Sequence, residues 1–107
     1  MRFSAAFCLL LALIPCSASA SPDLVAKKFN VDGVTRNILL CEGVPLPGGR
    51  PLILVFHGYG GTAQDAAQRF HLEEEWPMAM VAYIQGLTIP RDRGDGRIEP
   101  GKERAGW

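Results

Sequence analysis

Beyond residue 20, apolar residues gather in three short runs whose patterns differ. Val34 to Leu40 (VTRNILL) is β-branched and aliphatic, but Arg36 and Asn37 interrupt it, which predicts a strand near the edge of a sheet. Leu52 to Phe56 (LILVF) and Met78 to Ile84 (MAMVAYI) are apolar at nearly every position. Continuous hydrophobicity is typical of strands that are covered on both faces, as in the parallel sheets of α/β proteins.

A segment with helical spacing of its apolar residues lies between the last two runs. The apolar positions of this segment fall on one side of a helix: Ala63, Ala66, Ala67, Phe70 and Leu72. Thr62 followed three residues later by Asp65 predicts a capping box at the start, and Pro77 predicts the end. The order strand, glycine turn, helix, strand therefore predicts one βαβ unit with a right-handed crossover.

The remaining segments lack a regular pattern. Residues 21–33 are expected to be a leading segment, residues 43–50 (GVPLPGGR) a turn, and residues 85–107 a long polar loop. One helix cannot cover both faces of two fully apolar strands, and the chain stops on Trp107, a large apolar residue. We therefore expect an α/β fold with one edge strand and one βαβ unit, incomplete as given, from the front of a larger protein.

The first twenty residues have the three parts of a secretory signal peptide. Arg2 lies near the start, an apolar stretch runs from Phe7 to Ile14, and small residues lead to a predicted cleavage after Ala20. Removal of residues 1–20 leaves 87 residues with a formal charge of about −1 and no basic block. We expect a secreted or periplasmic monomer that binds neither nucleic acid nor, after cleavage, a membrane.

Cysteine usage leaves two alternatives open. The chain has 3 cysteines, and Cys8 and Cys16 would leave with the signal peptide. Cys41 is then either a buried thiol or half of a disulfide whose partner lies outside these residues.

The glycine-rich segment His57-Gly58-Tyr59-Gly60-Gly61 directly follows the apolar strand that ends at Phe56. A nucleotide-binding loop is disfavoured, because neither GxGxxG spacing nor a Gly-Lys-Ser/Thr sequence is present. Two interpretations remain: a tight structural turn, and an oxyanion hole that presents bare backbone amides to a developing negative oxygen.

Three segments in order, LVFHGYGG, MAMVAYIQGL and PGKERAGW, carry a family resemblance. Together they resemble the secreted α/β-hydrolase esterases of the polyhydroxybutyrate depolymerase and feruloyl esterase type. The similarity covers about residues 33–107. Ile84 departs from it, since proline is usual there, and the stretch from Thr88 to Lys102 matches loosely. The resemblance implies that this chain is the N-terminal part of an α/β-hydrolase fold.

The resemblance also implies roles for the turn. The backbone amide of Tyr59, or that of Gly60, would donate to the oxyanion, Gly58 and Gly61 would permit the bend, and His57 would orient the loop. The nucleophile of such enzymes lies in a G-x-S-x-G elbow, followed by an acid and a histidine. No such elbow exists in this chain, whose mature part has Ser21 as its one serine.

Metal and cofactor binding have little support in the sequence. His71 and Glu74 are spaced to share a face of the helix but lack a third ligand, so we expect neither metal nor cofactor. The acidic run Glu73 to Glu75 near the helix end predicts a solvated surface.

These observations favour a secreted serine-type carboxylic ester hydrolase, represented by a fragment that has the oxyanion turn but no nucleophile. By resemblance, its substrates would be polyesters or carbohydrate-linked esters. The alternative is a short exported protein that binds a partner, or is vestigial, and performs no chemistry.

Overall fold

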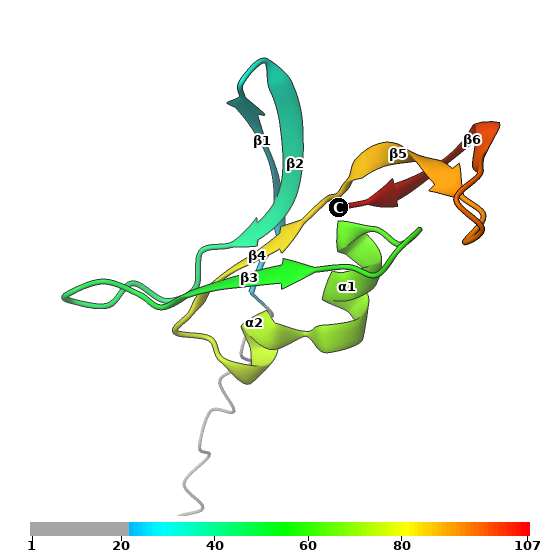
Figure 1. Cartoon of the computed structure of the whole chain (residues 1–107). Helices are drawn as coiled ribbons and strands as arrows, with labels where there is room; N and C mark the ends of the chain where they lie inside the picture. The colour runs from blue at the N-terminus through cyan, green and yellow to red at the C-terminus, as the bar shows by residue number, and fades with distance from the viewer. Residues whose placement is uncertain (1–21) are drawn as a thin grey trace, which may run out of the picture.

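The computed structural model describes residues 22–107, and strands hold 46% and helices 14% of them. The main sheet has the order β1-β2-β4-β3. Its strands are β1 (Val25–Val31), β2 (Val34–Cys41), β3 (Leu52–Phe56) and β4 (Met80–Ile84). β1, β2 and β4 pair antiparallel in turn, whereas β3 pairs parallel with β4. A second sheet contains β5 (Leu87–Asp92) and β6 (Ile98–Gly106) (Figure 1).

The predicted fold class is wrong. The described residues form a mostly β structure with a mixed four-stranded sheet and a two-stranded sheet, and they lack the many helices of an α/β-hydrolase. Two segments without hydrophobic periodicity account for the difference, since both form antiparallel hairpins. The strand–helix–strand connection from β3 to β4 does occur, but it is one part of a β-rich arrangement.

The leading segment forms strand β1, which takes the edge of the sheet. The prediction that residues 34–40 lie near an edge is therefore wrong, since β2 is an inner strand. Asp32 (φ 52°) and Gly33 (φ 79°) are both left-handed, as the two central residues of a type I′ hairpin turn must be. The side chain of Asn30 accepts a hydrogen bond from the Gly33 amide at 2.9 Å. Asp-Gly is a strong hairpin signal, so the sequence did contain this information.

Residues 85–107 were also predicted to be a loop, and they form the β5–β6 hairpin. The register shifts between Pro90, which pairs with Glu103, and Arg91, which pairs with Glu99. Proline interrupts a regular strand pattern because it cannot donate to the ladder, and the shift removes the alternation that predicts strands.

Helix α1 (Ala63–Phe70) begins as predicted. Thr62 accepts a hydrogen bond from the Asp65 amide at 3.0 Å, and the Asp65 carboxylate accepts one from the Thr62 amide at 2.9 Å. The helix ends earlier than Pro77, because His71 adopts a left-handed conformation (φ 46°) and starts a separate short helix, α2 (Leu72–Glu75).

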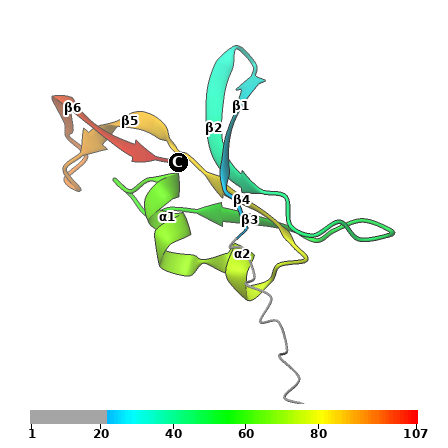
Figure 2. The same cartoon turned by 180° about the vertical axis from the view of Figure 1, so that it is seen from behind.

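Both helices pack against the same face of the main sheet (Figure 2). The core between them contains Cys41, Val55, Ala63, Ala66, Ala67, Ala79, Val81 and Tyr83. The central strand β4 is buried on both faces, as its sequence predicts. The edge strand β3 is not, since Leu52, Leu54 and Phe56 are each more than half exposed. The prediction of two covered faces is therefore wrong for β3.

Candidate functional site

His57 fixes the junction between two parallel strands. It follows β3 directly, is only 5% exposed, and lies beside Gln85 and Gly86, which follow β4. The Gly86 amide donates to His57 Nε2 at 2.9 Å, so Nε2 has to be the unprotonated acceptor. Nδ1 then carries the proton and donates it to the carbonyl oxygen of Gly58 at 2.7 Å. His57 is thus a neutral ring with both nitrogens engaged, which fits an orienting role and not that of a general base.

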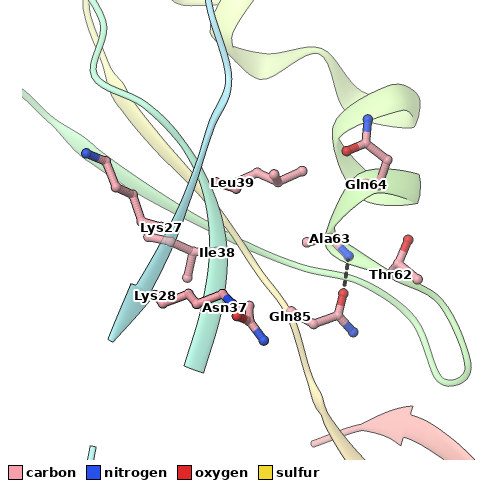
Figure 3. Close-up of a pocket in the computed structure, with 10 residues that line it drawn as sticks. Lys27, Lys28, Asn37, Ile38, Leu39, Thr62, Ala63, Gln64 and Gln85 are labelled. Carbon is pink, nitrogen blue, oxygen red and sulfur yellow. Dashed lines mark hydrogen bonds between the residues drawn. The ribbon is translucent and has the colours of Figure 1, made fainter. Parts of the chain in front are cut away.

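Gln85 connects this junction to helix α1. Its Oε1 accepts a hydrogen bond from the Ala63 amide at 2.9 Å, as Figure 3 shows. Its amide nitrogen lies 3.3 Å from His57 Nε2 and 3.3 Å from the Gly86 carbonyl oxygen, to which it donates. The Gln85 side chain therefore accepts a hydrogen bond from an N–H that has no partner within the helix. This bond holds the start of α1 against the carboxyl end of β4.

The glycine turn itself has two of its amides engaged. Gly60 is left-handed (φ 76°), and its amide donates to the Ala105 carbonyl oxygen of β6 at 2.8 Å. The Gly61 amide donates to the Gly58 carbonyl oxygen at 3.0 Å. The Tyr59 amide donates no hydrogen bond to any group described in residues 22–107. Of the two amides predicted to face an oxyanion, that of Tyr59 is the free one.

Trp107 packs on the end of β3. Its indole N–H donates to the His57 carbonyl oxygen at 3.0 Å, and its ring meets that of Phe56 edge to face, with centroids 4.8 Å apart. The side chain remains 56% exposed, so it covers the base of the turn without being part of the core.

Two cavities flank the turn. One, of about 280 Å³, lies on the side of α1 and is lined by Phe56, His57, Gly58, Tyr59, Gly61, Asp65, Ala66, Arg69 and Phe70. The other, of about 240 Å³, lies on the side of the β5–β6 hairpin and is lined by Tyr59, Gly60, Arg91 and Arg104. Tyr59 borders both. A third, largely apolar cavity of about 300 Å³ lies between the β1–β2 hairpin and the start of α1, where Figure 3 shows Lys27, Leu39 and Gln85 among its lining.

The structure brings all five predicted turn residues together and adds partners that sequence reasoning missed. Gln85, Gly86, Ala105 and Trp107 hold the turn, although they lie far from it in sequence. Gln85 and Gly86 belong to MAMVAYIQGL, and Ala105 and Trp107 belong to PGKERAGW. Both segments carried the family resemblance, which was the one available signal. Ala105 acts through its backbone carbonyl, so its side chain type does not reveal the contact.

A hydroxyl nucleophile of the expected kind is missing from the described part of the chain. Residues 22–107 contain no serine. Cys41 is a free thiol, only 3% exposed, within the core under the helices. It is therefore buried, as one of the two alternatives held, and it lines neither of the cavities beside the turn.

Glu73 is buried, in contrast to the predicted acidic surface. It is 4% exposed and accepts a short hydrogen bond from the hydroxyl of the fully buried Tyr83, which in turn accepts one from the Leu72 amide at 3.0 Å. Burial, followed by the hydrogen bond to Glu73, raises the pKa of Tyr83 from 10.0 to about 12. This pair anchors α2 to β4 and lies away from the turn.

His71 and Glu74, the two residues considered as metal ligands, lie on the surface of the helical segment. His71 Nδ1 and Glu74 Oε1 are 3.9 Å apart on exposed side chains, and residues 22–107 contain no group of three or more potential ligands. No helix within that range is long and apolar enough to span a bilayer. The predicted signal peptide and its cleavage site lie outside the described residues.

Comparisons of this chain with protein-family models, with curated proteins and with solved structures found no match. The esterase resemblance therefore rests on the sequence motifs alone.

Proposed function

We propose that this chain is the N-terminal part of a secreted serine-type carboxylic ester hydrolase, of the polyhydroxybutyrate depolymerase or feruloyl esterase type. Its turn at residues 57–61 supplies one donor of the oxyanion hole. The observation that carries the proposal is the free amide of Tyr59 next to a buried, neutral His57 whose two nitrogens fix the turn. A preorganised donor of this kind stabilises the tetrahedral intermediate of acyl transfer by several kcal/mol.

The nucleophile has to come from outside residues 22–107, because these contain no serine. The reading frame beyond codon 107 tests this requirement. An open frame that soon encodes G-x-S-x-G supports the proposal, whereas a well-supported stop codon overturns it.

We expect the 107-residue chain by itself to hydrolyse p-nitrophenyl acetate no faster than buffer, because it has half an oxyanion hole and no nucleophile. Ser21→Ala should leave that background unchanged. Turnover that Ser21→Ala abolishes would show that the chain contains its own nucleophile and would contradict this assignment.

In a longer, active polypeptide, two glycine variants test the turn. Gly60→Ala places a side chain at a positive φ and displaces the neighbouring Tyr59 amide, so kcat should fall about tenfold or more with little change in KM. Gly58→Ala is the matched control: although Gly58 was expected to permit the bend, its φ is not positive, and nothing lies within 4 Å of its added Cβ. Equal kcat values for the two variants would contradict an oxyanion role.

An exported binding protein without catalytic chemistry is the second candidate. The lack of a serine in the described residues favours it. It predicts a stop after codon 107 and no esterase activity in any longer product.

A further inference from the structure

The cavity on the hairpin side of the turn contains two guanidinium groups. Tyr59, Gly60, Arg91 and Arg104 line its volume of about 240 Å³, and none of these residues is acidic. The stem of Arg104 passes close to the turn, because its Cδ lies 3.7 Å from where a Cβ on Gly60 would be. The aliphatic stem of Arg104 therefore lies alongside Gly60, at the edge of the turn.

The charges around this cavity do not cancel. Arg91 Nη1 lies 3.3 Å from Glu99 Oε2, but the same carboxylate also pairs with Arg93 at 2.9 Å and with Lys102 at 3.7 Å. One carboxylate thus faces three cations. Arg104 has no ion pair or side-chain hydrogen bond to the side chains that the structure describes, and its own side chain is exposed. The cavity therefore has an excess of positive charge.

Strand register explains why Arg104 lies beside the turn. The Gly60 amide binds the Ala105 carbonyl oxygen, which fixes β6 against the turn at the residue next to Arg104. Arg104 pairs with Ile89 and Glu103 pairs with Pro90, and successive side chains of a strand point to opposite faces. Glu103 is therefore directed away from the face on which Arg104 lies.

We propose that Arg104, assisted by Arg91, binds a carboxylate, and that the ester acted on at this turn carries a free carboxylate close to its ester carbonyl. The substrate class would be esters that keep a free carboxylate, such as monoesters of dicarboxylic acids. A guanidinium fork matches the two oxygens of a carboxylate, and Tyr59, whose amide would donate to the ester group, lines the same cavity. The carboxylate site is inferred from the lining and charge of the cavity alone, whereas the ester assignment rests on the proposed function.

The inference is tested by titrating the 107-residue chain with two small esters and monitoring its amide signals by NMR. The probes are monomethyl succinate, which has one carboxylate, and dimethyl succinate, which has none, at matched ionic strength. We expect the monoester to bind about fivefold more tightly, the upper range for an exposed ion pair. Arg104→Gln should remove this preference. Arg97→Gln, on the same hairpin but outside the cavity, should retain it.

Two results would overturn the carboxylate site: equal affinity for the two probes, or a preference that survives Arg104→Gln. The proposed function has a separate readout. A change in the chemical shift of the Tyr59 amide on addition of the neutral diester would indicate that this amide binds an ester group, independently of any carboxylate binding. A retained monoester preference without any Tyr59 response would leave the carboxylate site intact and contradict the donor role of Tyr59.

Discussion

At the scale of single residues, the clearest effect of burial is on the hydroxyl of Tyr83. In the folded chain its pKa is about 12, against 10.0 for an unperturbed phenol. The unfolded chain therefore loses this proton first as the pH rises. The resulting contribution to stability, about 3 kcal/mol, is fully present below pH 10 and declines as the pH rises toward 12.

We expect the free energy of unfolding to fall between pH 10 and pH 12, measured by urea titration with circular dichroism. Tyr83→Phe should remove most of this pH dependence, while Tyr59→Phe, at the other tyrosine, should leave it in place. Ultraviolet absorbance of tyrosinate gives a second test, because the late-titrating phenol should disappear in Tyr83→Phe. A wild-type stability that stays constant over this interval would contradict the assignment.

At the scale of elements, α1 shows which local signals are sufficient to specify structure. Thr62 and Asp65 satisfy each other's backbone amides, and both side chains can do so from sequence spacing alone. The end of the helix is different. His71 ends it in a left-handed conformation that few non-glycine residues adopt, and the Ala67 carbonyl accepts the His71 amide there at 3.1 Å.

Thr62→Ala should lower the free energy of unfolding by about 1 kcal/mol, because it removes the side-chain acceptor of the capping box. Thr62→Ser keeps a hydroxyl at the same position and should lower the free energy of unfolding much less. Urea denaturation of the three proteins measures both values. If Ala and Ser were equally destabilising, the hydroxyl would not be the stabilising group.

The hairpins explain most of the error in the sequence-based fold. Strands β1, β5 and β6 pair antiparallel, and β1 is exposed along its length, so a hydrophobicity pattern gives little sign of it. Backbone hydrogen bonds hold such strands together with few buried side chains. Strands β3 and β4 were predictable because their residues are apolar and the core depends on them.

At the scale of the whole molecule, two glycines hold the second sheet against the first. A Cβ on Gly86 would lie 2.5 Å from the Gly106 carbonyl oxygen, too close for any side chain. The Gly86 amide also binds His57. This close approach is therefore what places β6, and with it Arg104, next to the turn.

Gly86→Ala should destabilise the chain by about 1–3 kcal/mol, because the backbone of β6 has to move away. Chemical shifts of the β5–β6 hairpin and of Gly60 should change together, since Ala105 joins them. Gly58→Ala, with open space around its Cβ, should leave both nearly unchanged. Unchanged Gly60 shifts in Gly86→Ala would contradict a rigid junction.

The sequence alone determined the local features: the strands at 52–56 and near 80–84, the cap at Thr62, and a glycine turn after His57. Each depends on residues a few positions apart. Only the tertiary structure decided which turn amide remains free and which cation lies beside it. Those outcomes depend on contacts from Gly86, Ala105 and Trp107, which are remote in sequence and act largely through the backbone or through register. Side-chain patterns encode burial well, but they do not encode which distant strands meet.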